Sequence, residues 1–342
     1  MRKLLWISIL LILAYAGYWA WSRYQAIYAS NVEVQETKEF LIYTGSDFEK
    51  VRTDLERSHA LKDLDAFLWV AEKKGYPDLI KPGRYLLKDG MSNNDLVDML
   101  RSGNQVPVKL SFNNVRNLAQ LAGKVGAKLE GDSLSFLKTF TDPETISYYG
   151  FTQENFIAMF IPNTYEFYWT TSEEDFVKRM ASEFKRFWTD DRMAKARALN
   201  LTQSEVVTLA SIVQAEQSMR PEEWPIIAGL YLNRLEQGIP LQSDPTVIFA
   251  TGNFGIRRVL NRHLKQDSPY NTYKNKGLPP GPIRMPDRGA IEAVLSPEEH
   301  EYIFMCATPD GSGVHKFSKT LKEHNRYAKE YQRAMNARGI FN

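Results

Sequence analysis

The sequence has few of the residues on which several protein classes depend. Its 342 residues include one cysteine, Cys306, which excludes an internal disulfide and any site with several cysteine ligands. The five histidines show no metal-ligand spacing and no HExxH motif, so we expect neither a metal nor a cofactor. Cys306 lies in the apolar run YIFMCA at 302–307 and is expected to pack in a core rather than act as a nucleophile.

A strong charge imbalance is also missing. The chain has 43 Lys and Arg against 41 Asp and Glu, a net charge of +2, so nothing global indicates nucleic-acid binding. Internal repeats and low-complexity stretches are absent from the sequence. With 43% hydrophobic and 25% charged residues, the composition is that of a globular protein with room for roughly two or three domains.

Long apolar runs are scarce, and the exception is at the N-terminus. Leu4–Trp21 is uncharged and about the minimum length for a membrane span. Arg2 and Lys3 precede it, and aromatic residues gather near its far end. We therefore predict a single-pass anchor over 1–24 in the cytoplasmic (inner) membrane, with the N-terminus in the cytoplasm and the rest outside. A cleaved signal peptide at AYA (14–16) is the alternative, but it would leave a very short apolar region.

The rest of the chain predicts an α+β protein in three further segments. Residues 25–108 alternate strand, paired helices, strand and helix, which resembles a LysM-like module; a plain spacer on the anchor is an equal alternative. Residues 109–200 are predicted as a mostly helical middle segment. Residues 201–342 are predicted as a catalytic domain of helices and a β-hairpin, with the hairpin turn near Gly311 and a final helix capped by Thr320.

One helix carries a candidate catalytic group. Thr202 and Glu205 have capping-box spacing, and apolar residues then recur at helical spacing as far as Val213. Glu216 falls on the same stripe, so burial is expected to raise the pKa of its carboxyl group. A protonated glutamic acid is what general-acid cleavage of a glycosidic bond requires. The alternative is that Glu216 turns to solvent or pairs with Arg220.

Three segments poor in regular structure follow this helix, at 241–246, 270–273 and 277–283. They are rich in amide, hydroxyl and aromatic groups, a mixture suited to sugar recognition. Long irregular segments inside a compact domain are usually functional. We therefore expect them to form a cleft, with proline-stiffened surface loops as the alternative.

Several motifs, in order, resemble one family. They are LASIVxxE (209–216), NRL (233–235), LQSDPTV (241–247), YNTY (270–273), GLPPGPI (277–283), HKF (315–317) and HN (324–325). Together they resemble the membrane-anchored endolytic murein transglycosylases, the MltG or YceG-like family, over nearly the whole chain. Two positions depart from that pattern. Gln214 and Asn163 stand where family members commonly have acidic residues. Gln214 leaves Glu216 as the only carboxylate for the catalytic role, whereas Asn163 keeps hydrogen bonding in its own loop but lacks the charge.

The resemblance implies cleavage of the MurNAc-β-1,4-GlcNAc bond inside peptidoglycan glycan strands. Glu216 would protonate the leaving oxygen and then deprotonate the muramic acid 6-hydroxyl, which closes a 1,6-anhydro ring. The substrate then supplies its own nucleophile, and the reaction would limit glycan strand length during wall synthesis, with cell-wall synthases as candidate partners. The candidate substrate-binding residues are Tyr165, Asn233, Gln242, Ser243, Asp244, Thr246, Tyr270, Asn271 and Tyr273.

Two other functions stay open at this point. A hydrolase of the same polymer needs a second carboxylate, and Asp244 is the candidate, although an Asp before Pro more often fixes a turn and Asp244 is also placed to pair with Arg234. A non-catalytic peptidoglycan-binding or scaffold protein would not need Glu216 at all. For Asn233 a helix-packing contact is the rival role, and His315 is expected to be structural.

Overall fold

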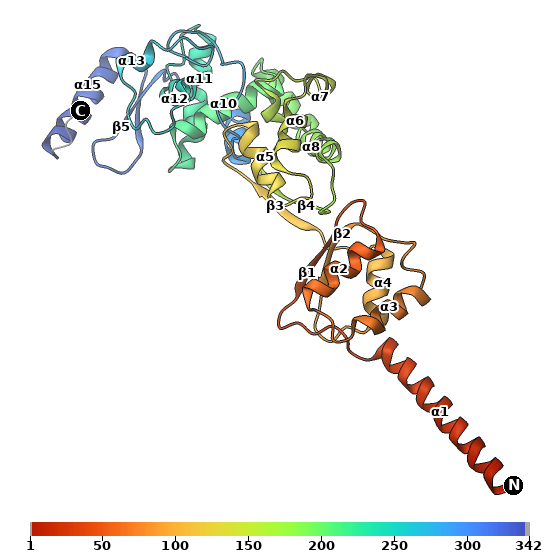
Figure 1. The fold of residues 1–342 in the computed structure, drawn as a ribbon. Coiled ribbons are helices and arrows are strands. Elements are labelled where there is room, and N and C mark those ends of the chain that lie inside the picture. The colour runs from red at the N-terminus through yellow and green to blue at the C-terminus, as the bar shows by residue number, and fades with distance from the viewer. Residues whose placement is uncertain (1, 339–342) are drawn as a thin grey trace. The chain divides into compact units, whose positions relative to one another are not determined.

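The structure is a computed structural model that describes residues 2–338, and it divides into two compact units. The first unit contains the chain as far as Leu110, together with 128–131 and 165–172. The second contains 111–127, 132–164 and the chain from Glu173 onward. Most of the predicted middle segment therefore shares a unit with the predicted catalytic segment. Helices dominate, and the strands within 2–338 form three two-stranded sheets, which confirms a mixed α+β architecture (Figure 1).

The N-terminal helix α1 (Arg2–Tyr28) is long and apolar enough to cross a membrane. Its most apolar 18-residue window has a mean hydropathy of 1.7, and none of that window is buried by the protein. The helix runs past the predicted boundary at residue 24. Its last turns belong to the first unit, because Asn93 donates a hydrogen bond to the Ala26 carbonyl at 2.8 Å and the Arg23 guanidinium lies 4.4 Å from the Trp69 ring centre.

The first unit combines a small sheet with three helices. Strands β1 (Lys38–Ile42) and β2 (Gly83–Leu87) pair antiparallel, with Phe40 opposite Tyr85. Helices α2 (Phe48–Ser58), α3 (Leu64–Lys73) and α4 (Asn93–Ser102) each begin at a side-chain cap. These helices lie where the sequence predicts them, because polar cap residues and the spacing of apolar residues are local signals.

The middle of the chain adds one sheet and a set of short helices. Strands β3 (Val108–Phe112) and β4 (Asn163–Phe167) pair with each other. The helices of this part of the chain are α5 (Leu118–Gly126), α6 (Ser133–Thr141), α7 (Pro143–Tyr148), η1 (Phe156–Met159), α8 (Glu173–Phe187) and α9 (Asp190–Ala198). Phenylalanines from α6, η1 and α8 form a cluster, in which the rings of Phe140 and Phe160 lie 5.3 Å apart.

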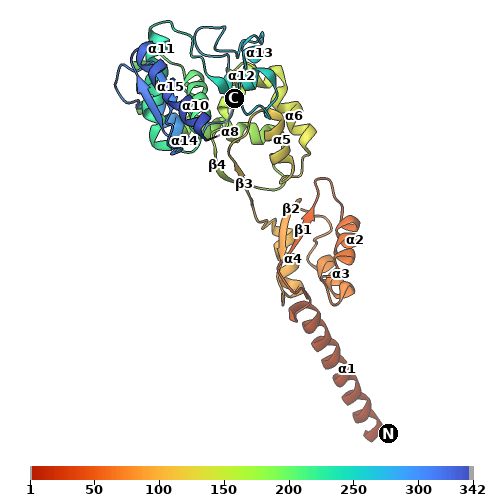
Figure 2. The same ribbon diagram turned by 90° about the vertical axis from the view of Figure 1, so that its left-hand side faces the viewer.

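Helix α10 (Gln203–Glu216) is the core element of the second unit. It begins at the predicted capping box, in which the Glu205 carboxylate accepts the Thr202 N–H at 2.8 Å. Every residue from Val206 to Gln214 is buried, so the helix is covered nearly all round rather than along one stripe. It packs against η1, α9, α11 (Trp224–Glu236), α12 (Asp244–Thr251) and α14 (Arg288–Leu295) (Figure 2).

One helix stands where the sequence indicated irregular chain. Helix α12 begins within the LQSDPTV motif, with Ser243 at its N-cap and Pro245 in its first turn. The Asp-Pro pair starts this helix, since proline has the backbone angle that a first helical turn needs. Helix α14 begins after its N-cap residue Asp287, without a proline in its first turn. The hairpin of β5 (Phe304–Ala307) and β6 (His315–Ser318), and α15 (Leu321–Ala337), follow the predicted pattern.

Candidate active site

Glu216 ends helix α10 and faces a pocket of about 350 Å³ in the second unit. The pocket is bounded by α11, the start of α12, the β5–β6 hairpin and the first turns of α15. Its lining contains both polar and apolar groups, which is typical of a ligand site. The lining residues are Glu216, Leu230, Tyr231, Arg234, Leu241, Gln242, Asp244, Tyr273, Phe304, Met305, Cys306, Ala307, His315, Leu321 and His324.

Two hydroxyl groups hold the Glu216 carboxyl group. The Tyr231 hydroxyl donates to Glu216 Oε1 at 2.8 Å, and the Ser243 hydroxyl donates to the same oxygen. Tyr231 is on α11 and Ser243 is the N-cap of α12, so three helices fix one side chain. Among residues 2–338 no group bonds Glu216 Oε2, which leaves that oxygen for a proton and a ligand. Glu216 does not pair with Arg220, whose guanidinium donates to the Ser312 carbonyl at 2.9 Å.

The pKa of Glu216 is raised above its ordinary value, chiefly because the carboxyl group is enclosed by protein. The hydrogen bonds from Ser243 and Tyr231 lower this pKa, because they favour the charged form. The Asp244 carboxylate raises the pKa and His315 lowers it, but burial is the largest influence. The result is a carboxylic acid that keeps its proton at higher pH than an exposed glutamate does.

Asp244 lies on the rim of the same pocket and is exposed. The Tyr273 hydroxyl donates to Asp244 Oδ1 at 2.7 Å, and burial raises the pKa of Tyr273, so that the phenol stays protonated. The predicted turn at Asp244 forms, because the Thr246 N–H donates to the Ser243 carbonyl at 3.2 Å, but the alternative ion pair with Arg234 is not formed. Asp244 is instead in the first turn of α12, where a negative charge is favoured by the helix dipole.

Arg234 is a buried cation at the back of the pocket. Its guanidinium donates to the Ile303 carbonyl at 2.6 Å and to the Leu241 carbonyl at 3.0 Å. It also donates to Gln242 Oε1 at 3.2 Å, and Gln242 has a left-handed backbone with φ of 53°. The direct partners of Arg234 are neutral, so its positive charge is available to the pocket. Its hydrogen bonds also join the chain just before β5 to the Leu241–Gln242 segment.

Several predicted substrate-binding residues do not line the pocket and contact other parts of the protein instead. Asn233 donates to the carbonyls of His300 and Tyr302 at 2.7 and 3.0 Å, so the helix-packing alternative describes it better. Asn271 and Thr246 are fully buried and bond to neighbouring chain. Tyr270 packs its ring 4.7 Å from that of Phe249. Tyr165 is buried in β4 and belongs to the first unit.

One group of pocket residues was not predicted to act at the site. His315 lines the pocket, and its Nδ1 lies 2.8 Å from Glu223 Oε2. Gln217, next to Glu216 in the chain, donates to the same Glu223 oxygen at 2.6 Å. Burial would raise the pKa of Glu223, but the hydrogen bonds from His315 and Gln217 outweigh it and lower that pKa. No local sequence pattern links Glu223 to His315, because the two positions are far apart in the chain. The only available signal was the pair of acidic residues that follows Pro221 at a helix start.

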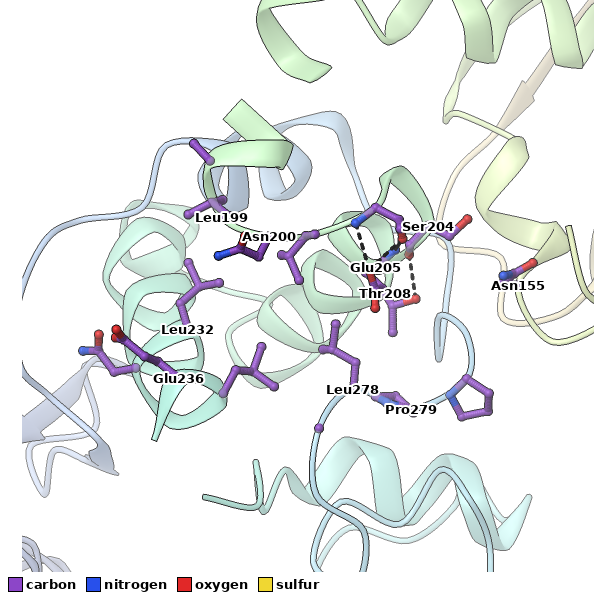
Figure 3. Close-up of a pocket in the computed structure, with 17 residues that line it drawn as sticks. Asn155, Leu199, Asn200, Ser204, Glu205, Thr208, Leu232, Glu236, Leu278 and Pro279 are labelled. Atoms are coloured by element: carbon purple, nitrogen blue, oxygen red, sulfur yellow. Dashed lines mark hydrogen bonds between the residues drawn. The ribbon is translucent and has the colours of Figure 1, made fainter. Parts of the chain in front are cut away.

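A second, larger hollow of about 830 Å³ lies at the other end of α10 (Figure 3). It contains Leu278 and Pro279 from the GLPPGPI segment, which was expected to form a cleft with Glu216 and does not line its pocket. The Glu205 carboxylate in this hollow is bound to the Thr202 cap. Gly281 of the same segment is packed so closely on the Glu154 carbonyl that a Cβ atom would lie 2.0 Å from it, so the segment has a packing role.

An enclosed glutamic acid at a pocket is an arrangement that can donate and accept a proton, as many enzyme active sites do. The chain belongs to the YceG-like family, whose model matches residues 40–330. It is similar to the endolytic murein transglycosylase of Bacillus subtilis (strain 168), with 30% identity over 306 residues that cover 85% of this chain and 83% of the relative.

Two further relatives extend the comparison. The endolytic murein transglycosylase of Streptococcus pneumoniae (strain ATCC BAA-255 / R6) is 29% identical over 95% of this chain, which spans 64% of that relative's length. The crystal structure of a YceG-like protein from Listeria monocytogenes is also similar, with a TM-score of 0.56 and 29% identity. That similarity covers 86% of this chain and 99% of the crystallised one, so the fold is shared over most of both.

Proposed function

We propose that this chain is an endolytic murein transglycosylase that cleaves peptidoglycan glycan strands at internal MurNAc-β-1,4-GlcNAc bonds. The observation that carries the proposal is the Glu216 carboxyl group, which is enclosed, has a raised pKa and lines a pocket. Family membership and the names of the relatives support the substrate. The alternative of a binding protein without activity gives no reason for a carboxyl group to be held in this way.

We propose Glu216 as both acid and base. Its proton passes to the glycosidic oxygen as the C1–O bond breaks, and the carboxylate so formed is stabilised by the hydroxyl groups of Tyr231 and Ser243. The carboxylate then takes the proton of the muramic acid 6-hydroxyl, whose oxygen bonds to C1 and closes a 1,6-anhydro ring. Glu216 is protonated again at the end, so protons balance over the cycle.

A hydrolase is the second candidate, and Asp244 is the observation that favours it. This carboxylate lines the same pocket as Glu216 and is held by Tyr273. It would activate a water molecule in place of the 6-hydroxyl. In either reaction we propose Gln242, Asp244 and Tyr273 as the pocket's substrate contacts, because they line it from one side.

The remaining parts of the chain receive proposed roles from their composition. We propose that α1 is an uncleaved anchor in the cytoplasmic membrane, with Arg2 and Lys3 inside and the enzyme outside. Residues 25–108 are proposed as a LysM-like module, 109–200 as a helical middle segment and 201–342 as the catalytic domain. Cell-wall synthases are proposed partners, since the reaction would limit the length of the strands that they make.

The test is mass spectrometry of products from uncrosslinked glycan strands incubated with the full-length chain and with Glu216→Gln. We expect internal fragments ending in 1,6-anhydro-muramic acid, and at least a hundred-fold lower rate for the variant. Glu222→Gln is the matched control, because Glu222 is an exposed neighbour of the site. Reducing ends would identify a hydrolase and implicate Asp244, whereas no cleavage by the unmodified chain would refute an enzymatic role.

A further inference from the structure

The segment that leaves and re-enters the active site is unusually basic. Helix α12 starts at Asp244 on the pocket rim, and the chain returns to the pocket at Tyr273. Between them lie residues 252–266, called here the basic loop. It contains Arg257, Arg258, Arg262 and Lys265 and no acidic residue, in a chain whose net charge is only +2. The loop therefore carries a local excess of positive charge between two segments that reach the pocket.

The cations of the basic loop are exposed, and Arg262 Nε lies within hydrogen-bond distance of its neighbour His263 Nε2 at 3.2 Å. All four side chains are exposed, and among residues 2–338 none of them forms an ion pair. The nearest acid along the chain, Asp267, is already paired with Lys274 at 2.9 Å. Surface charges are commonly paired or interspersed with the opposite sign, so a run of arginines without an acidic partner indicates an anionic ligand.

A fifth cation reaches the same surface from another element. Arg116, just before α5, is exposed and lies with its guanidinium 4.6 Å from the ring centre of Phe254 in the basic loop. Phe254 and Leu260 are each 39% exposed. The surface thus combines guanidinium groups with apolar contacts, as a site for an anionic chain with small apolar side groups requires.

The basic loop is held in place rather than hanging free. Asn271 donates to the carbonyls of Leu264 and Gln266 at 2.9 and 2.8 Å, and its own side chain is fully buried. At the other end the Phe249 ring packs 6.3 Å from Phe254 and 4.7 Å from Tyr270. Asn271 therefore has a structural role in the basic loop, although it does not line the pocket. The same contacts connect the loop to the segment that carries Tyr273.

We propose that the basic loop and Arg116 bind the carboxylates of the peptide stems on the glycan strand. This inference rests on the proposed function, which puts a glycan strand in the pocket. The stems hang from the muramic acid sugars next to the bond that is cut and end in carboxylates, which guanidinium groups bind in bidentate fashion. The enzyme would then prefer strands that still carry their peptides over strands from which the peptides have been removed.

The experiment compares peptide-bearing strands with strands stripped by an amidase. The variant is R257Q/R258Q/R262Q in the full-length chain in detergent. Its control is K178Q/K185Q/R197Q, which removes the same charge from exposed positions on α8 and α9. We expect the variant to lose about ten-fold in kcat/KM on peptide-bearing strands, from three exposed charge pairs, and to match the unmodified chain on stripped strands. The loss should shrink in about 0.3 M salt.

Binding to the catalytically inactive chain separates this inference from the proposed function. In a Glu216→Gln background, R257Q/R258Q/R262Q should weaken binding of peptide-bearing strands only, whether or not the unmodified chain cleaves anything. Equal loss on both substrates, or no loss on either, would overturn the inference and leave the cleavage reaction untouched. So would protection of the loop by anionic phosphatidylglycerol vesicles but not by free stem peptides, since that result would identify a lipid-facing surface.

Discussion

At the scale of single residues, one carboxyl group is subject to opposing influences. Enclosure raises the pKa of Glu216, and the hydrogen bonds from Ser243 and Tyr231 lower it. Both bonds go to Oε1, so they orient the group while they limit its basicity. The pKa of Glu216 must be high enough for the group to hold its proton near neutral pH. It must also be low enough for the group to give that proton to the leaving oxygen.

Substituting Ser243 should change this balance in a known direction. Ser243→Ala removes a bond that favours the charged form, so the pKa of Glu216 should rise further. The alkaline limb of the kcat/KM profile, which reports loss of the acid's proton, should move to higher pH. The rate itself should fall several-fold, because Oε1 keeps only the Tyr231 bond. The measurement is the pH–rate profile on glycan strands.

Ser204→Ala is the matched control for that profile, because Ser204 lies at the opposite end of α10 and lines the larger hollow. It should leave the alkaline limb where it is. If the alkaline limb of the Ser243→Ala profile keeps its position, or moves to lower pH, the role assigned to the Ser243 hydroxyl group is contradicted. A general loss of folding would lower the rate without moving the limb, so the two effects are separable.

At the scale of elements, the β5–β6 hairpin is attached to the catalytic helix through one buried carboxylate. Glu223 accepts the His315 N–H at 2.7 Å, lies 2.8 Å from His315 Nδ1 and accepts from Gln217 at 2.6 Å. Gln217 directly follows Glu216, and its carbonyl accepts the Trp224 indole N–H at 2.7 Å. The end of α10 and the pocket wall that carries His315 are therefore held by the same group.

Glu223→Gln should weaken that attachment. At neutral pH the free energy of unfolding should fall by about 2 kcal/mol, because hydrogen bonds to a charged group each contribute roughly 1.5–3 kcal/mol. The pKa of Glu223 is lowered in the folded state, so its contribution is present above the ordinary value of 4.5 and is lost as pH falls through the folded value. The difference between the two chains in urea unfolding should shrink on acidification below about 4.5.

Glu222→Gln tests whether burial matters in this comparison. Its side chain is 64% exposed, so the variant should change stability by at most about 0.5 kcal/mol. Equal effects of the two substitutions would show that the attachment of the hairpin contributes little. A difference between Glu223→Gln and the unmodified chain that grows below pH 4.5 would contradict the sign of the Glu223 pKa shift.

Local signals explain what could be predicted from sequence at this scale. The Thr202–Glu205 spacing predicted the start of α10, and turn residues predicted the hairpin. Helix α12 was missed because Asp-Pro is shared by turns and helix starts, and only the packing of α12 on α10 decides between them. The partners of Glu216 were not predictable for the same reason. Tyr231 and Ser243 reach it by tertiary packing, which no spacing along the chain encodes.

At the scale of the whole molecule, the connection between anchor and enzyme differs from expectation. The sequence predicted that the anchor ends at residue 24, but α1 continues to Tyr28. The chain then joins the first unit at once, with the Val32 N–H donating to the Met91 carbonyl at 3.0 Å. A helix that enters a folded unit without a flexible break fixes the distance of that unit from the membrane, if α1 spans it as proposed.

Moving that unit outward should therefore change the products. Two added helical turns after Trp21, about 10 Å of Ala, Glu and Lys, keep the Arg23 and Asn93 contacts and shift the first unit away from the membrane. Strands made by a membrane-bound synthase should then be cut at a greater mean length, measured by chromatography of the anhydro-ended products. The same residues appended after Asn342 are the control and should leave the length unchanged. Products of equal length from both chains would mean that cutting distance is set by the synthase or by the pocket, and α1 would then serve only to keep the enzyme at the membrane.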